Sequence, residues 1–254
     1  MPGIPGREVL AYLPPSLAAL GPAAAAVSGR RYPVLYFHDG QNVFDQVTSY
    51  SGEWHVDETL EMLAGEGLEA IAVAVPNAGD GRMDEYNPWP ESDHLWHGRR
   101  VGGMGDAYLA FLTETVMALV EGSFPVSRAR EATGVIGSSM GGLISLYALL
   151  ACGDRFGLAG VMSPSLGWSD FRLLRLIEER GLPPARLHLD MGGLEWRGMT
   201  AQARRLRGLL LAQGFVEGRD LHYVEDPRAR HDEGAWAARL PDALRFLLAE
   251  TRSG

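Results

Sequence analysis

The chain contains no lysine, and all 23 of its basic residues are arginine. This absence excludes reactions that need a lysine amine, such as Schiff-base formation, and nucleotide binding by a Walker A loop. The single cysteine, Cys152, excludes an internal disulfide bond and a metal site built from several cysteines. No apolar run approaches the roughly 20 residues that a membrane-spanning helix needs.

Basic clusters are also scarce in a chain whose formal net charge is −9. The densest cluster, Arg204, Arg205 and Arg207, lies in a predicted helix, so neither nucleic acid nor an anionic membrane is expected as a partner. The early alanine-rich stretch 17–29 does not fit a signal peptide, because Pro22 interrupts it and a strand-like segment precedes it. We therefore expect a soluble, cytoplasmic protein, although a single cysteine is also compatible with export.

Apolar strand-like segments alternate with segments of helical periodicity along most of the chain. Strands are predicted over 8–14, 33–40, 70–76, 132–139, 156–164, 186–193 and 220–226. Helices are predicted over 54–67, 106–122, 140–152, 170–181, 199–213 and 232–250. This alternation predicts an α/β fold, with a mostly parallel sheet covered by helices on both faces. The length and the lack of a repeat or linker indicate one domain over 1–254.

One long segment, 76–104, has no usable periodicity. Loops of this length in a compact domain are usually functional or disordered, and its aromatic residues Tyr86, Trp89 and Trp96 argue against disorder. We expect this insertion to pack over the strand ends, where open α/β sheets bind their ligands.

The most informative motif is Gly137-Ser138-Ser139-Met140-Gly141, between a predicted strand and a predicted helix. A Gly-x-Ser-x-Gly turn in this context is the nucleophile elbow of α/β-hydrolases, in which a sharp turn exposes the serine hydroxyl. Glycines are needed because side chains beside the serine would collide with the adjoining strand and helix. Ser139 is therefore the candidate nucleophile.

A serine hydroxyl needs a base to remove its proton, and α/β-hydrolases supply a histidine late in the chain. Of the seven histidines, three follow Ser139: His188, His222 and His231. The first two lie in predicted strands, where their side chains are not free to approach a strand end. His231 lies between the last predicted strand and the last helix, which makes it the candidate base by elimination.

The acid that orients this histidine should follow the strand at 186–193. Asp190 lies on that strand, whereas Glu195 lies in the loop beyond it, from which its longer side chain can turn back towards His231. We favour Glu195 and keep Asp190 as the second choice. Glu225 and Asp226 are more distant alternatives.

Charge that develops on the substrate carbonyl oxygen needs preorganised donors. The N–H of Met140, at the start of the helix after the nucleophile, is one candidate, and the N–H of Gln41, after the strand at 33–40, is the other. Gly40 permits the tight turn between that strand and Gln41. His38 and Asp39 have no partner at metal-ligand spacing, so we expect neither a metal nor a cofactor.

Several segments together resemble one family: YPVLYFHDGQNVFD, AVAVPNAGDGRMDEYNP, GSSMGGLISLYALL, GVMSPSLGW and HDEGAW. They are similar to the esterase-D-type "putative esterase" branch of the α/β-hydrolases, over about Arg31 to Trp236. That branch includes feruloyl and acetyl-xylan esterases, enterobactin-type siderophore esterases, S-formylglutathione hydrolases and mycolyltransferases.

The resemblance implies an α/β-hydrolase fold, supports Ser139, His231 and the two amides in the roles given above, and favours Glu195 as the acid. The MGGLEW loop matches the family imperfectly, which keeps Asp190 open. The resemblance also suggests Trp54, Tyr86 and Trp89 as residues of a substrate pocket.

The resulting hypothesis is a serine carboxylic ester hydrolase that acts on a small-molecule ester through an acyl-enzyme. Acyl transfer to an alcohol is an alternative, since another acceptor can intercept the same intermediate. A non-catalytic binding protein that retains the fold is a second alternative.

Overall fold

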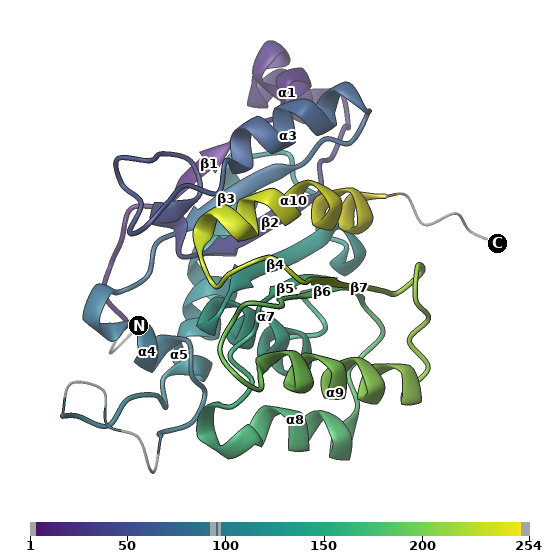
Figure 1. Cartoon of the computed structure of the whole chain (residues 1–254). Coiled ribbons are helices and arrows are strands. Elements are labelled where there is room, and N and C mark those ends of the chain that lie inside the picture. The colour runs from purple at the N-terminus through teal and green to yellow at the C-terminus, as the bar shows by residue number, and fades with distance from the viewer. Residues whose placement is uncertain (1–3, 92–94, 96–97, 250–254) are drawn as a thin grey trace.

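The computed structural model describes residues 4–91, 95 and 98–249. A seven-stranded sheet of order β1-β3-β2-β4-β5-β6-β7 runs through these residues (Figure 1). Only the edge strand β1 is antiparallel to its neighbour, which confirms the mostly parallel sheet. The strands are β1 (Leu10–Tyr12), β2 (Val34–His38), β3 (Ile71–Val75), β4 (Thr133–Ser138), β5 (Leu158–Met162), β6 (Arg186–Gly192) and β7 (Leu221–Asp226).

Helices cover both faces of the sheet (Figure 1). On one face α3 (Val56–Gly65) packs against α10 (Glu233–Leu248). The other face carries α7 (Met140–Ala151), α8 (Trp168–Arg180), α9 (Met199–Ala212) and a longer helical segment. That segment consists of α5 (Gly105–Ala110), the π-helix η3 (Phe111–Val116) and α6 (Met117–Ser123). None of the helices in the described ranges is long and apolar enough to cross a membrane.

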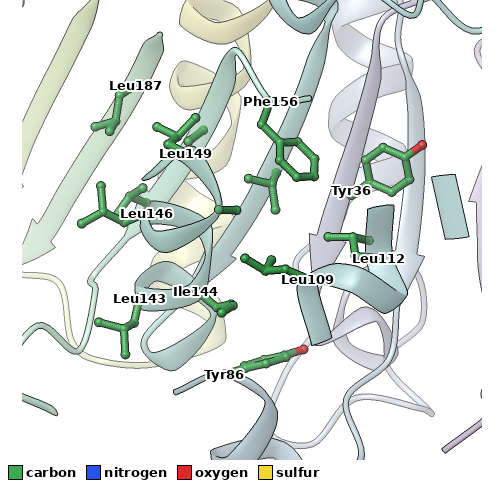
Figure 2. Close-up of a cluster of buried hydrophobic side chains, with 14 of the residues drawn as sticks. Tyr36, Tyr86, Leu109, Leu112, Leu143, Ile144, Leu146, Leu149, Phe156 and Leu187 are labelled. Atoms are coloured by element: carbon green, nitrogen blue, oxygen red, sulfur yellow. The ribbon is translucent and has the colours of Figure 1, made fainter. Parts of the chain in front are cut away.

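Two hydrophobic cores lie on opposite faces of the sheet, because successive strand side chains point to opposite sides. In β2, Tyr36 belongs to the core under α7, whereas Leu35 and Phe37 belong to the core under α3 and α10. Figure 2 shows the first core, where the ring of Phe156 lies between Tyr36 and the leucines of α7. Burial on both faces explains why β3 (IAVAV) and β5 (LAGVM) are apolar along their whole length.

Several elements differ from the prediction. Two short helices, α1 (Pro15–Leu20) and α2 (Pro22–Val27), occupy the early alanine-rich region. Each begins with proline, whose fixed φ suits the first helical position. Helix α8 begins at Trp168 with three residues of positive φ, 169–171, so its first turn is not a regular α-helix. A 3₁₀ turn, η4 (Arg130–Ala132), leads into β4.

The predicted insertion at 76–104 also contains structure. It holds the 3₁₀ turn η2 (Gly79–Gly81) and the short helix α4 (Arg82–Glu85), both too short to give a periodic signal. Positions 92–94 and 96–97, including Trp96, lie outside the described residues.

The parallel arrangement brings several loops to one edge of the sheet. β4, β5, β6 and β7 are consecutive neighbours, so their carboxyl ends lie side by side. Ser139 follows β4 directly, Ser163 follows β5, and Glu195 and His231 lie in the loops after β6 and β7. Residues far apart in the sequence therefore meet at this edge, as expected for an α/β sheet.

Candidate active site

The turn at Ser139 has the strained geometry that the motif predicts. Ser139 has φ 57° and ψ −118°, and its N–H donates to the carbonyl of Met162 at 3.0 Å. A Cβ on Gly137 would lie 2.7 Å from the carbonyl carbon of Gly141, so glycine is required there. A Cβ on Gly142, just outside the motif, would lie 2.9 Å from the Met162 oxygen. Gly142 therefore lets α7 pack closely against β5.

Glu195 and His231 form a close pair in adjacent loops. The Nδ1 of His231 lies 2.7 Å from Oε2 of Glu195, and the Glu195 side chain is only 1% exposed. The other carboxylate oxygen, Oε1, accepts the N–H of Gly192 at 2.7 Å. The rings of Trp196 and Trp236 lie against the His231 ring, with centroids 4.4 and 4.9 Å away. The histidine is thus held by one carboxylate oxygen and two indoles.

The hydroxyl of Ser139 has a partner that the sequence prediction missed. Its Oγ lies 3.1 Å from Oγ of Ser165, whose N–H donates to the Ser139 carbonyl at 3.0 Å. No hydrogen bond joins Ser139 to His231 within the described part of the chain. Catalytic hydrogen bonds are often long before substrate binds, so this geometry is compatible with a serine–histidine pair. Nothing in the spacing of Ser165 pointed to this contact.

Asp190, the second choice for the acid, is engaged elsewhere. Its buried carboxylate accepts two hydrogen bonds from Arg239, at 3.0 and 3.1 Å, and lies 3.2 Å from Nε2 of His188. Burial alone would raise the pKa of this carboxyl, but His188 and Arg239 hold it below its ordinary value. The structure therefore pairs His231 with Glu195 and leaves Asp190 in an ion pair with α10.

The two more distant acids also have other partners. Glu225 accepts two hydrogen bonds from Arg204, both at 2.7 Å, and these lower the pKa of its carboxyl to about 2. Asp226 accepts the N–H of Arg228 at 2.9 Å. Neither has a described hydrogen bond to His231.

The loop after β2 lies beside the start of α7. Its 3₁₀ turn, η1 (Gly40–Asn42), follows Asp39, which has φ 54°. A Cβ on Gly40 would lie 2.4 Å from the N of Val75, so only glycine lets this loop approach β3. Gly141 comes close to the same loop, since a Cβ there would lie 3.4 Å from Oδ2 of Asp39. This contact brings the loop that carries Gln41 close to the first turn of α7.

Met140 is the first residue of α7. The first N–H groups of a helix have no acceptor within it, and they carry the positive end of the helix dipole. Both features suit the N–H of Met140 to binding negative charge.

A buried polar network supports the loop after β2. The carboxylate of Asp39 accepts two hydrogen bonds from Arg82, both at 2.7 Å, and one from Asn77 at 2.6 Å. Burial opposes ionisation of Asp39, but Arg82 and Asn77 keep the pKa of its carboxyl below the ordinary value. The Asp39 N–H donates to the hydroxyl of Tyr86 at 2.9 Å. The loop is therefore anchored by residues of the 76–104 insertion.

His38 belongs to this network and is almost fully buried. Its Nδ1 lies 2.7 Å from the Tyr108 hydroxyl, and its Nε2 has no hydrogen-bond partner among the described residues. Burial lowers the pKa of His38 to about 3, because a charged imidazole would lose its hydration. We therefore expect His38 to stay neutral in the folded protein at the pH values where histidines usually titrate.

This shift predicts a pH-dependent stability. The unfolded chain protonates His38 near pH 6.5, but the folded chain does so only near pH 3. Between these values the unfolded state binds the extra proton, so stability falls as the pH falls, by about 2 kcal/mol between pH 7 and pH 5. Urea unfolding at both pH values measures this loss. Between pH 7 and pH 5 the unfolding free energy of His38→Gln should fall by about 2 kcal/mol less than that of the wild-type protein. Equal losses would contradict the buried neutral state of His38.

Two of the three predicted pocket residues lie in the protein core instead. Trp54 is 3% exposed and packs against Trp236, and Tyr86 is fully buried with its hydroxyl bound to Asp39. Neither exposes enough surface to line a substrate pocket, and the sequence offered no way to separate exposed from buried aromatics. Trp89 is half-buried and contacts Tyr147 and Arg172.

The observed pocket is formed by other residues. A hollow of about 370 Å³ adjoins the Ser139 hydroxyl through Ser165. Its walls are Glu91, Ser165, Gly167, Trp168, Trp196, Met199 and Gln202. A larger hollow of about 780 Å³ includes Arg31, Phe124 and Arg128, but none of the residues discussed as catalytic. We therefore take the smaller hollow as the candidate substrate site.

One group of side chains has the composition of a cation site. The ligand atoms of Glu53, His55 and Glu58 lie within 4.8 Å of one another at the start of α3. Two of these residues are exposed, and His55 lies 3.6 and 3.5 Å from the two carboxylates. Exposed acidic groups commonly gather in this way, so the cluster alone does not identify a metal site.

Comparisons with known proteins find related sequences and structures. A family model described as "Putative esterase" matches residues 7–247. "Uncharacterized protein YbbA" of Bacillus subtilis (strain 168) is 27% identical over 256 residues, which cover 97% of this chain and 94% of that protein. The "Siderophore triacetylfusarinine C esterase" of Aspergillus fumigatus is 31% identical over 146 residues, 56% of this chain and 47% of that protein.

The fold also occurs among solved structures. The crystal structure of the enterobactin esterase FES from Shigella flexneri superposes with a TM-score of 0.70 at 19% identity, covering 94% of this chain and 54% of that one. At this identity the likeness concerns the fold, and it confirms the predicted α/β-hydrolase architecture.

Proposed function

The chain belongs to the "Putative esterase" family and is a carboxylic ester hydrolase, and we propose that it cleaves its ester through an acyl-enzyme on Ser139. The observation that carries this proposal is the 2.7 Å contact between Glu195 and His231, at the same edge of the sheet as the strained turn at Ser139. Glu195, His231 and Ser139 follow β6, β7 and β4, which lie within four consecutive strands of the sheet, β4 to β7. They combine an acid, a base and a nucleophile at one edge of the sheet.

The contact with Glu195 fixes the role of each ring nitrogen of His231. A carboxylate only accepts hydrogen bonds, so Nδ1 carries the proton and Nε2 is left as the base. Ser139 Oγ gives its proton to Nε2 as it attacks the ester carbonyl carbon. The proton then passes to the oxygen of the departing alcohol, and the acyl group remains on Ser139.

A water molecule completes the reaction. His231 takes a proton from the water as it attacks the acyl-enzyme, and returns that proton to Ser139 Oγ when the carboxylic acid leaves. The N–H groups of Gln41 and Met140 stabilise the negative oxygen in both steps. Both belong to backbone held rigidly by Gly40 and by α7, so little reorganisation is needed during the reaction.

We place the acyl group in the pocket beside Ser165. Trp168 and Trp196 offer apolar walls, and Glu91 and Gln202 add polar groups. The relatives are named as a siderophore triacetylfusarinine C esterase and an enterobactin esterase. Triacetylfusarinine C is therefore a suitable test substrate beside the simple reporter p-nitrophenyl acetate.

A fluorophosphonate probe tests the proposed nucleophile. We expect one molecule of probe per chain, attached to Ser139 and located by peptide mass spectrometry, because only an activated serine reacts quickly. Heat-unfolded protein should not be labelled. The matched variant Ser165→Ala should still be labelled at Ser139, whereas attachment to Ser165, or no labelling of active protein, would overturn the proposal.

A further inference from the structure

Ser163, the residue that follows β5, has no role in the mechanism above, yet it contacts the proposed acid directly. It is fully buried, and its φ of 41° is unusual for a residue other than glycine. Its Oγ lies 2.5 Å from Oε1 of Glu195. The same Oγ lies 3.0 Å from Nε1 of Trp236 and 3.0 Å from Nη2 of Arg239. One hydroxyl thus has three protein partners.

The chemistry of these partners fixes the direction of the hydroxyl proton. Indole and guanidinium N–H groups can only donate, so Trp236 and Arg239 occupy both lone pairs of Ser163 Oγ. The remaining proton must point to Glu195, the only acceptor of the three. A hydroxyl that usually rotates freely is here a donor in one direction.

This donor determines how Glu195 can bind. Oε1 accepts hydrogen bonds from both the Ser163 hydroxyl and the Gly192 N–H, so this oxygen is fixed as an acceptor. Oε2 is then the oxygen that remains for His231, at 2.7 Å. The carboxylate cannot rotate without breaking at least two charge-assisted hydrogen bonds.

Asp190 and Arg239 hold Ser163 in place. The Ser163 N–H donates to Oδ1 of Asp190 at 3.0 Å, and Arg239 bridges Asp190 and the Ser163 hydroxyl through the two hydrogens of Nη2. Asp190 and Arg239 are both at least 93% buried, so water does not compete with these bonds. The ion pair that removed Asp190 from the acid role therefore fixes the residue that orients Glu195.

From these contacts we infer that Ser163 is a positioning residue. Its hydroxyl, directed by Trp236 and Arg239, holds Glu195 so that His231 keeps its proton on Nδ1 and presents Nε2 as the base. This inference rests on the proposed function, because it assumes that Glu195 and His231 act on Ser139. Because the hydroxyl acts on the catalytic histidine and not on the substrate, its loss should lower kcat and leave KM nearly unchanged.

Two variants test the role of the hydroxyl. Ser163→Ala removes Oγ and keeps the positive-φ strain, whereas Ser163→Gly removes Oγ and also relieves the strain. We expect both to lower kcat for p-nitrophenyl acetate by about 10- to 100-fold, the effect of losing a hydrogen bond to a charged catalytic group, with little change in KM. Fluorophosphonate labelling of Ser139 should slow by a similar factor.

The matched control is Thr133→Val, at the end of β4 far from Ser139. It removes a buried hydroxyl that donates to the Ala129 carbonyl, and should leave kcat unchanged. Proton NMR supplies a second readout, since the downfield resonance of the His231 Nδ1 proton should move in both Ser163 variants and not in Thr133→Val. A folded Ser163→Gly with unchanged kcat and an unchanged resonance would overturn the inference.

The same experiments distinguish the two proposals. If the wild-type protein is not labelled at Ser139, the proposed acyl-enzyme on Ser139 is wrong. If it is labelled, and the Ser163 variants react at the same rate, the acyl-enzyme proposal stands and only the positioning role of Ser163 is wrong.

Discussion

Replacement of Ser139 by alanine is expected to lower kcat/KM for p-nitrophenyl acetate by about 10⁴- to 10⁶-fold, as for other serine hydrolases that lose their nucleophile. The change removes Oγ, the atom that would carry the acyl group, and leaves the donors of the loop after β2 in place. The residual activity would come from binding and from the N–H groups of Gln41 and Met140. Steady-state kinetics with protein purified free of host esterases measures this effect.

The neighbouring serine is the control for this variant. Ser138 is buried at the end of β4 and takes no part in the proposed reaction, so Ser138→Ala should retain most of the activity. Ser139→Ala should fold, because alanine keeps the same Cβ in the same strained turn. If Ser139→Ala stayed active, the hydrolysis would proceed without an acyl-enzyme on this residue.

The sequence predicted the positions of the central residues because strand order constrains them. The segments that form β4, β6 and β7 were predicted as strands from the sequence, and parallel strands bring their carboxyl ends to one edge. Ser139, Glu195 and His231 each follow one of these strands, so the sequence alone predicts that they lie at the same edge of the sheet. The sequence also predicted that turns require Gly40 and Gly137, and close backbone contacts at both positions leave no room for a side chain.

The substrate pocket could not be predicted in the same way. Trp54 and Trp196 look alike in the sequence, yet one is 3% exposed in the core and the other is 67% exposed beside His231. Exposure of an aromatic depends on what packs over it, which is a tertiary property. For Ser163 and Ser165, neither spacing nor local pattern distinguishes them from the other serines. Their roles follow from side chains that α7, β6 and α10 bring together.

Glu195→Gln is expected to lower mainly kcat, whereas Asp190→Asn is expected to lower mainly the stability of the fold. This difference tests the assignment of Glu195 as the acid. Oε1 of Glu195 accepts from the N–H of Gly192, which can only donate. In Glu195→Gln the amide oxygen must therefore take that place, and the NH₂ group faces Nδ1 of His231. His231 is then forced to carry its proton on Nε2, where it cannot accept the proton of Ser139. We expect kcat to fall by about 10³- to 10⁴-fold, with little loss of stability.

Asp190→Asn should instead weaken the fold. It leaves the buried guanidinium of Arg239 without its counter-charge, a change that costs about 3–5 kcal/mol in buried ion pairs. Urea unfolding measures this loss, and kinetics at low temperature, where the variant stays folded, should show a smaller fall in kcat than Glu195→Gln. Part of that fall would come through Ser163, whose N–H and Arg239 contacts depend on Asp190. If Asp190→Asn abolished activity in stably folded protein while Glu195→Gln did not, Asp190 would be the acid, because the more damaging amide identifies the carboxylate on which His231 depends.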